Sequence, residues 1–185
     1  EIAAYNVPSG VMFDIMREAG AKRPGVITKV GLDTFVDPEH EGCAMNGRAA
    51  AQPIVKKIRF ENEDWLFFPT ITPKVSIIRG STCDRRGNMT FGQEGAYLGA
   101  MELALAAHNT GGIVIAQVRK IVENDTIKPH DVHVPGILVD YIVEAPGQWQ
   151  TTQTPYDPAI SGEEQRPLSS FDLMEFGTGK VIARR

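Results

Sequence analysis

Residues 113–116, Ile-Val-Ile-Ala, are apolar at every position. A strand with one face in water would alternate apolar and polar residues, and this run does not. This pattern is typical of a parallel β-strand that is buried on both faces between helices. A stretch with helical spacing precedes it over residues 94–108, and residues 75–78 form another short apolar strand ahead of a loop at 79–88. Strands that alternate with helices predict an α/β fold with an open, mixed or parallel sheet sandwiched by helices.

Two helices are expected to cover this sheet. The helix over 94–108 has one stripe of larger side chains, formed by Leu98, Met101, Leu105 and His108. An earlier helix follows a possible N-cap at Asn6, with Pro8 in its first turn and Gly20 as its stop. Its apolar face consists of Val11, Met12, Ile15, Met16 and Ala19.

The remaining elements are short. Residues 26–30 predict a strand that leads into a polar loop over 31–48, and residues 54–68 predict a β-hairpin around a polar turn at 61–64. Two more strand segments are expected at 132–134 and 137–143. From residue 144 to residue 179 the composition changes to Pro, Gly, Gln, Thr and Ser, which is typical of a long loop or crossover.

Composition excludes several classes of protein. The chain has 185 residues, is 42% hydrophobic, and carries a formal net charge of −4, which argues against disorder and against a nucleic-acid binder. No apolar run approaches the roughly 18–20 residues of a membrane-spanning helix. The two cysteines, Cys43 and Cys83, are expected to be small buried hydrophobes in a reducing cytosol. The chain begins at Glu1 and ends in a helix-like turn, so we expect a segment of a longer polypeptide.

The histidines and two of the aspartates are the first candidates for a metal or catalytic site. His130-Asp131-Val132-His133 fits a surface strand edge better than a metal site, because positions i and i+3 of a strand point to opposite faces. Neither His40 nor His108 has a partner at ligand spacing, so no metal site is predicted. Asp33 and Asp37 fit either turn capping or chemistry. The helix start at residues 6–10 fits either capping or an anion site made of free N–H groups.

Six blocks, taken in order, resemble the family I CoA-transferases, which move coenzyme A between short carboxylic acids. They cover most of residues 2–145 and look most like the single-chain bacterial acetate, propionate or acetoacetate enzymes. The blocks are residues 4–10 with Asn6-Val7-Pro8-Ser9-Gly10, residues 28–38 with Lys29-Val30-Gly31-Leu32-Asp33-Thr34, Glu41-Gly42 with Asn46, residues 78–88 with Arg79-Gly80-Ser81-Thr82, Asp84, Gly87 and Asn88, residues 111–114 with Gly111-Gly112, and residues 134–140 with Val134-Pro135-Gly136.

The resemblance implies a ping-pong transfer through a glutamyl-CoA thioester, with the coenzyme A thioester as substrate and no separate cofactor. The nucleophilic glutamate of the family lies in the second half, in a Glu-Asn/Ser-Gly setting. Glu61-Asn62-Glu63 and Glu123-Asn124-Asp125 lack that glycine, so no catalytic residue is predicted in this chain. Residues 1–144 would be a partial N-terminal domain, 145–179 a linker and 180–185 the start of the second half, with the fold incomplete at both ends.

The resemblance also implies partners and a binding site. Acyl-CoA, a short-chain carboxylate and the chain's own C-terminal half are the expected partners of a cytoplasmic homo-oligomer, without nucleic acid or membrane. The expected substrate-binding residues are Ser9, Gly10, Gly31, Thr34 and Asn46. Relatives often carry Gln at the position of Ser9, and turn roles explain Gly31 and Asn46 equally well. The alternatives are a sugar-phosphate isomerase or deaminase of related fold, and a non-catalytic binding or assembly module.

Overall fold

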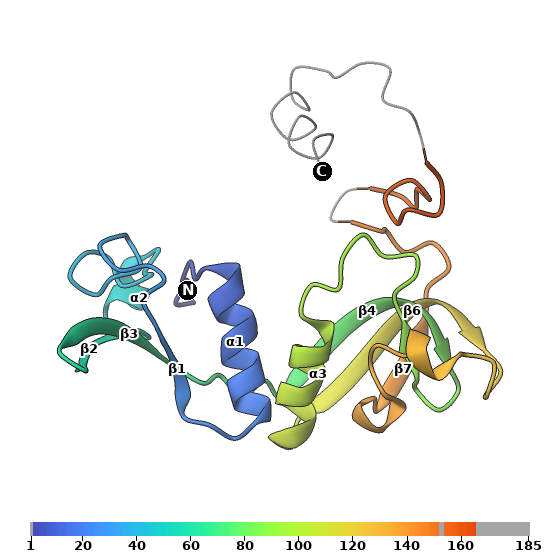
Figure 1. Ribbon diagram of the computed structural model, residues 1–185, viewed down its shortest axis with the longest axis horizontal. Coiled ribbons are helices and arrows are strands. Elements are labelled where there is room, and N and C mark those ends of the chain that lie inside the picture. Colours follow the sequence, from blue (N-terminus) through green and yellow to red (C-terminus); the bar gives the residue numbers. More distant parts are fainter. Residues whose placement is uncertain (1, 152–153, 166–185) are drawn as a thin grey trace, which may run out of the picture.

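The computed structural model describes residues 2–151 and 154–165. Within these residues, two helices lie side by side between two sheets, which gives four layers (Figure 1). The helices are α1 (Ser9–Gly20) and α3 (Ala100–Asn109). The three short helical turns are α2 (Gly47–Ala50), η1 (Pro129–Asp131) and η2 (Gly136–Leu138). The open, mixed α/β fold expected from the sequence is confirmed.

The four-stranded sheet has the order β5-β4-β6-β7 and packs against α3. Its strands are β4 (Val75–Asp84), β5 (Met89–Thr90), β6 (Ile113–Val122) and β7 (Tyr141–Glu144). Strands β4, β6 and β7 run parallel, whereas β5 pairs antiparallel with the end of β4. The predicted strand at 132–134 is wrong: Val134 makes only an isolated bridge with Met89, and the residues around it form the turns η1 and η2.

The smaller sheet is antiparallel, has the order β1-β3-β2 and packs against α1. Its strands are β1 (Gly25–Thr28), β2 (Lys56–Phe60) and β3 (Glu63–Pro69). The predicted hairpin is confirmed, with a tighter turn than expected. Glu61 and Asn62 both have positive φ, at 51° and 63°, as the two central residues of a type I′ turn require.

Strand β4 extends beyond its prediction, since the expected loop at 79–88 is strand as far as Asp84. The error has a physical cause: the polar residues in this stretch find partners inside the fold. Arg79 pairs with Glu94, and the Ser81 hydroxyl accepts the N–H of Gln93. Satisfied polar groups allow a strand to continue through a polar sequence.

Helix α3 begins six residues later than predicted. Leu98 and Gly99 have φ values of 48° and 70°, so the chain turns left-handed before the helix starts at Ala100. The predicted stripe is also wrong, because Leu98 and His108 are exposed and the buried helical side chains are alanines: Ala100, Ala104, Ala106 and Ala107. Small side chains let the helix lie close to both the sheet and α1.

Helix α1 has the predicted apolar face, with Val11, Ile15, Met16 and Ala19 buried. Its predicted cap is wrong. Pro8 occupies the N-cap position, and no side chain caps the helix. Asn6 lies two residues earlier, where its backbone N–H donates to the carbonyl of Cys43. The described residues therefore start this helix without a side-chain cap.

The four-stranded sheet has helical cover on one face in the described part of the chain. Register places Ile77, Ile115 and Tyr141 in one row on the face away from α3, and Ile77 and Tyr141 are largely exposed. No helix of the described residues is long and apolar enough to cross a membrane. Residues 145–151 and 154–165 contain neither helix nor strand, and the predicted start of a second half at 180–185 lies outside the described residues.

Candidate functional site

The predicted substrate-binding residues Ser9 and Gly10 form the first turn of α1, and both are exposed. The first hydrogen bond of the helix runs from the Met12 N–H to the Pro8 carbonyl at 3.0 Å. The N–H groups of Ser9, Gly10 and Val11 have no acceptor among the described residues. We call this group, together with the Ser9 hydroxyl, the helix-start site; its dipole and free donors suit an anion.

Three segments that are distant in sequence lie side by side next to this site. The Asn6 N–H donates to the Cys43 carbonyl at 2.9 Å, and the Met45 N–H donates to the Ala4 carbonyl at 2.9 Å. The Cys43 N–H donates in turn to the Phe35 carbonyl at 3.0 Å. These bonds bring the loop that holds Gly31 and Thr34 beside the segment that enters α1.

Gly31 and Thr34 build the turn of that loop. Gly31 has φ of 99°, and a Cβ there would lie 2.6 Å from the Val36 side chain, so only glycine fits. The Thr34 hydroxyl donates to the Gly31 carbonyl at 2.7 Å and accepts the Val36 N–H at 3.2 Å. Both residues therefore have structural roles, and their contact with a substrate stays a prediction.

Asn46 also has a structural role. Its side-chain oxygen accepts the Ala49 N–H at 2.9 Å as the N-cap of α2, and its amide donates to the Ile2 carbonyl at 3.0 Å. The side chain thus joins α2 to the N-terminal segment. Ser9 and Gly10 differ from Thr34 and Asn46, because the side chains of Thr34 and Asn46 are already engaged in hydrogen bonds within the described residues.

Asp37 is fully buried beneath the same loop. Its carboxylate accepts the N–H groups of Glu39 and Asp33 at 3.0 and 3.1 Å, and Lys57 donates to it at 3.1 Å. Burial alone would raise the pKa of Asp37, but these hydrogen bonds and the Lys57 charge outweigh burial and lower it. Of the two interpretations left open by the sequence, turn capping is the one that these contacts support.

Both cysteines are buried free thiols, as predicted. Burial raises the pKa of Cys43, and burial together with the Asp84 charge raises the pKa of Cys83 to about 12. A thiol with a raised pKa is a poor nucleophile. Neither cysteine is therefore equipped for covalent catalysis.

A buried acid that the sequence analysis missed lies at the other helix. The Glu94 carboxylate accepts a hydrogen bond from Arg79 Nε at 3.0 Å and another from the Gln148 amide at 3.4 Å, and it forms an ion pair with Arg79 Nη2 at 2.9 Å. Burial raises the pKa of Glu94, while the charges of Arg79 and Arg119 act to lower it. One hint of this buried acid is present in the sequence, because Glu94 is followed by Gly95, which is unfavourable inside the helix predicted for this stretch. An adjoining cavity of about 460 Å³ is lined by Arg79, Glu94, Tyr97, Leu98 and Gln150, among others.

The histidines do not gather into a ligand set. His130 lies in η1, whereas His133 stacks on Tyr97 with ring centroids 4.0 Å apart, so the predicted strand edge is wrong. In residues 2–151 and 154–165, no group of three or more His, Cys, Asp or Glu side chains could hold a metal ion.

The two glutamates with a following asparagine lie in exposed turns. Glu61 is the first central residue of the β2–β3 hairpin turn. Glu123 follows β6 and pairs with Arg85 at 2.9 Å on the surface. Within the described residues, neither glutamate forms a hydrogen bond or an ion pair with the helix-start site.

A layered, open α/β chain with an anion-type site at a helix start defines a class of fold that serves many activities. Comparison with known proteins gives the family. Residues 1–145 match the family described as coenzyme A transferase, and the chain belongs to this family.

Individual relatives extend over the whole chain. The caffeate CoA-transferase of Acetobacterium woodii is 44% identical over 188 residues, covering 100% of this chain and 36% of the relative. The acetate CoA-transferase YdiF of Escherichia coli strain K12 is 39% identical, covering 100% and 35%. The chain thus spans about a third of the length of the curated relatives that it matches.

The solved structures agree with this assignment. The acyl-CoA transferase YdiF of E. coli O157:H7, in a thioester complex with CoA, superimposes with a TM-score of 0.84 at 37% identity. That comparison covers 100% of this chain and 36% of the solved chain.

Proposed function

We propose that this chain forms part of an acyl-CoA:carboxylate CoA-transferase that exchanges coenzyme A between short-chain acids such as acetate. The family match over residues 1–145 is the observation that carries the proposal. The names of the relatives, which are caffeate and acetate CoA-transferases, support an acid as the acceptor. The exposed anion-type site at the start of α1 suits a carboxylate substrate.

The proposed reaction proceeds by two acyl exchanges on one glutamate. The glutamate carboxylate attacks the thioester carbonyl of acyl-CoA, expels the CoA thiolate and forms a mixed anhydride. The thiolate then attacks the glutamyl carbonyl, which releases the free acid and leaves an enzyme–CoA thioester. The acceptor carboxylate repeats the two steps in reverse, so the thioester's energy is retained instead of being lost to water.

This chain's proposed contribution is binding and orientation. The N–H groups of Ser9 and Gly10, with the Ser9 hydroxyl, would hold the carboxylate of the acid or the oxygen of the developing anhydride. The loop of Gly31 and Thr34 would form the adjoining wall. The nucleophile would come from residues beyond these 185, supplied by the C-terminal half that we propose as the chain's partner.

Two measurements on the full-length protein test the proposal. Labelled acetate mixed with an acyl-CoA should yield labelled acetyl-CoA, and the absence of label would overturn the proposal. Borohydride added after acyl-CoA should inactivate the protein by reducing an enzyme–CoA thioester. A sugar-phosphate isomerase or deaminase, or a non-catalytic assembly module, would show neither exchange nor trapping.

The setting of the protein follows from the same proposal. Two unpaired buried thiols suit a reducing compartment, and we infer a cytoplasmic location. A homo-oligomer is the expected assembly, to be measured by light scattering on the full-length protein. No cofactor besides the CoA thioester substrate is required by the proposed chemistry.

A further inference from the structure

The polar segment beyond β7 lies against the fold without forming a helix or a strand. We call its described residues, 145–151 and 154–165, the strap. The strap begins where the Ala145 N–H donates to the Val118 carbonyl of β6 at 2.7 Å, and in Figure 1 it follows β7 in orange and red. Segments of this length without secondary structure are uncommon in compact domains, and they are usually either functional or unfolded linkers. The contacts of the strap with the fold distinguish the two.

Gln148 fastens the strap to the four-stranded sheet. It is only 7% exposed, although glutamine is mostly a surface residue. Its amide nitrogen donates to the Gly80 carbonyl of β4 at 2.7 Å, and its amide oxygen accepts a hydrogen bond from the Gln117 amide of β6 at 3.1 Å. One buried amide therefore joins the strap to two neighbouring strands.

Gln150 fastens the strap to the loop of residues 91–99, which precedes α3. It is 1% exposed, and its amide nitrogen donates to the Gln93 carbonyl at 2.8 Å. Its amide oxygen accepts the Asp157 N–H of the strap itself at 2.8 Å. A buried amide that is paired at both ends specifies one geometry, because another path of the chain would leave buried polar groups unpaired.

An ion pair completes this network. Arg79 of β4 donates to the Glu94 carboxylate at 3.0 Å and to the Gln150 carbonyl. Glu94 is buried and also accepts the Gln148 amide at 3.4 Å. We call Arg79, Glu94, Gln148 and Gln150 the clasp. The clasp connects a strand, the 91–99 loop and the strap.

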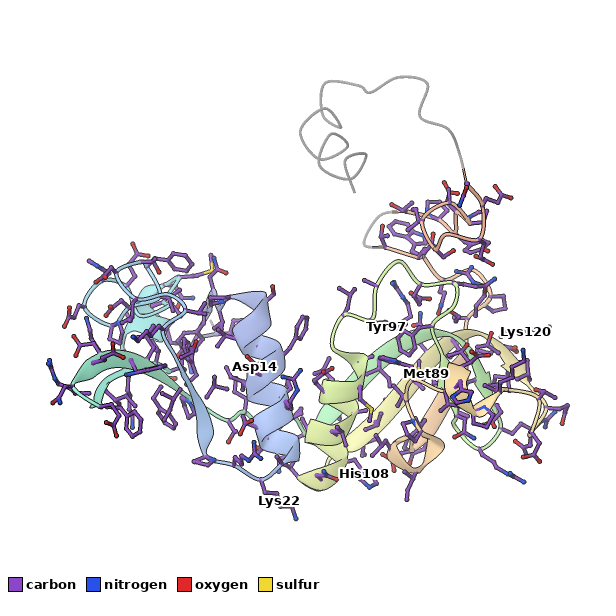
Figure 2. The ribbon with its side chains drawn as sticks, in the orientation of Figure 1. Asp14, Lys22, Met89, Tyr97, His108 and Lys120 are labelled. Carbon is purple, nitrogen blue, oxygen red and sulfur yellow. The ribbon has the colours of Figure 1, made fainter. Side chains whose placement is uncertain are left out.

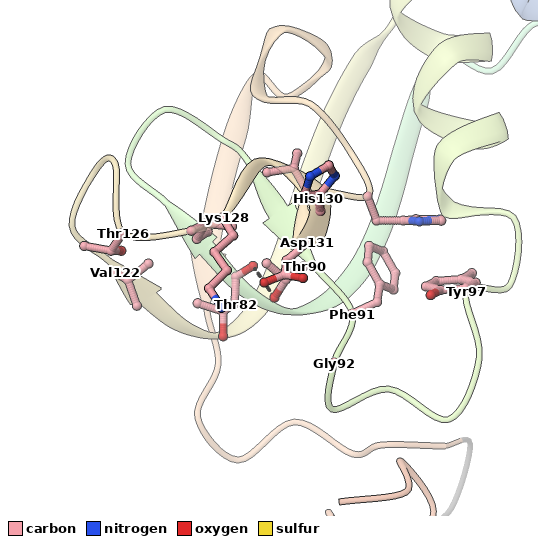
Figure 3. A pocket seen from close by; sticks show the side chains of 13 residues that line it. Thr82, Thr90, Phe91, Gly92, Tyr97, Val122, Thr126, Lys128, His130 and Asp131 are labelled. Atoms are coloured by element: carbon pink, nitrogen blue, oxygen red, sulfur yellow. Dashed lines mark hydrogen bonds between the residues drawn. The ribbon is translucent and has the colours of Figure 1, made fainter.

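The 91–99 loop also contacts α1. At its far end the Phe13 ring packs against Gly99, and Phe13 lies about one turn beyond Ser9 on the helix. Within the loop, Phe91 and Tyr97 meet edge-on with ring centroids 5.6 Å apart (Figure 3). In the view of Figure 2, Tyr97 lies between α3 below and residues 154–165 above. One loop is thus in contact with both the strap and the helix that carries the helix-start site.

We propose that the clasp is a joint that positions the second half of the protein against the helix-start site, an inference that rests on the proposed function. In that function the nucleophile comes from residues that follow this chain, and the strap is the described segment that leads toward them. Gln148 and Gln150 are then positioning residues, because they set where the strap leaves the fold. An error of about 1 Å in the placement of a reacting group can slow a reaction about a hundredfold.

The rate of thioester formation tests this joint in the full-length protein. Gln150→Leu keeps much of the side chain's volume and removes its amide. After mixing with acetyl-CoA, the enzyme–CoA thioester is followed by mass spectrometry of quenched samples. Its rate constant should fall about tenfold to a hundredfold, while the final fraction of protein that carries the thioester stays at the wild-type level. A merely structural defect would give fewer reacting molecules at the wild-type rate constant, and that result would overturn the proposal.

Two further variants keep this test decisive. Gln52→Leu replaces an exposed glutamine and is the matched control, so its rate constant should equal that of the wild type. Gln148→Asn shortens the other buried amide by one carbon and should slow the reaction about threefold or more. If Gln150→Leu does not fold, a wild-type rate constant in Gln148→Asn would overturn the joint.

Hydrogen exchange of the strap gives a measurement that does not depend on the transferase activity. The backbone amides of residues 154–165 should exchange faster in Gln150→Leu than in the wild type, because the Asp157 N–H loses its acceptor. Unchanged exchange would overturn the role of the clasp. Wild-type protein that forms no thioester from any acyl-CoA, yet shows this change in exchange, would instead overturn the proposed transferase function.

Discussion

Ser9 combines three properties that make it the most informative single residue of the helix-start site. It is exposed, its backbone N–H has no acceptor in the described residues, and its hydroxyl makes no hydrogen bond there. The polar side-chain atoms of Thr34 and Asn46, by contrast, form hydrogen bonds within the protein. A substrate carboxylate could therefore accept hydrogen bonds from Ser9 without displacing another acceptor of the described residues.

Replacing Ser9 by alanine tests whether its hydroxyl donates to the substrate. Ser9→Ala should lower kcat/KM about tenfold, because a lost hydrogen bond costs roughly 1–1.5 kcal/mol. Ser9→Thr keeps a hydroxyl and should retain most of the activity. Steady-state kinetics with acetyl-CoA gives the answer, and an unchanged kcat/KM in Ser9→Ala would leave the backbone N–H groups as the donors.

Asp37 should make the free energy of unfolding depend on pH in the acidic range. Its pKa is lowered below the ordinary 3.8, so the unfolded chain binds more protons than the folded chain as the pH falls. The stabilisation is complete above about pH 4 to 5 and is lost as the pH falls through the folded pKa. Asp37→Asn should lower the thermal midpoint at pH 7 and flatten its decline in acid.

Asp33→Asn provides the control for that experiment. Asp33 is exposed with φ of 59°, a conformation that asparagine also tolerates, and its side chain accepts no hydrogen bond in the described residues. Its melting curve should follow the wild-type protein at each pH. If Asp37→Asn gave a pH profile parallel to the wild type, the buried carboxylate would not be the source of the acid dependence.

At the scale of elements, the contact between α1 and α3 positions the candidate site. The two helices meet at both ends: the Phe13 ring packs on Gly99, and the Asn109 side chain donates to the Gly20 carbonyl at 2.7 Å. A Cβ at Gly20 would lie 3.0 Å from the Leu105 Cβ and 3.2 Å from the Leu105 carbonyl carbon. This close approach requires a residue without a side chain.

Gly20→Val should therefore force the helices apart. We expect a loss of about 1–3 kcal/mol in the free energy of unfolding, because the clash involves backbone as well as side chain. Gly47→Val is the matched control, since a Cβ at Gly47 meets nothing within 4 Å and its effect should stay within about 1 kcal/mol. Urea denaturation of both variants measures the difference; equal midpoints would show that the helices adjust without cost.

Elements with a regular apolar pattern could be predicted from the sequence, and elements whose limits depend on distant contacts could not. The apolar face of α1 and the hairpin around Glu61 followed from local spacing. The start of α3 was missed because the left-handed Leu98–Gly99 turn depends on packing against Phe13. The length of β4 was missed because Arg79 is satisfied by Glu94, fifteen residues away.

The candidate site divides in the same way. The helix start at Ser9 and Gly10 was predictable, because a proline followed by an apolar helical pattern marks a helix beginning. Glu94 was not predictable as a buried acid, because its partners Arg79 and Gln148 come from other segments. Nor could sequence spacing indicate that Tyr97 and Lys128 line one cavity together with Thr82 of β4 and Val122 of β6.

At the scale of the whole molecule, two central helices are shared by two outer sheets (Figure 1). The run at 113–116 predicts cover on both faces of its sheet, and the described residues provide it on the face of α3. The helix-start site lies at the exposed first turn of α1. A substrate held there by residues of this chain would leave its reacting carbonyl for a nucleophile from elsewhere.

Glutamate substitutions within the chain test that division of labour. Glu61→Gln and Glu123→Gln should leave label exchange and borohydride trapping intact in the full-length protein, because both side chains lie in exposed turns. Glu94→Gln breaks a buried pair with Arg79, so it should lower stability and yet permit trapping of the folded fraction. Mass spectrometry of the reduced protein locates the modified glutamate. A modification at any of these three residues would place the nucleophile inside this chain and contradict the proposed role of the second half.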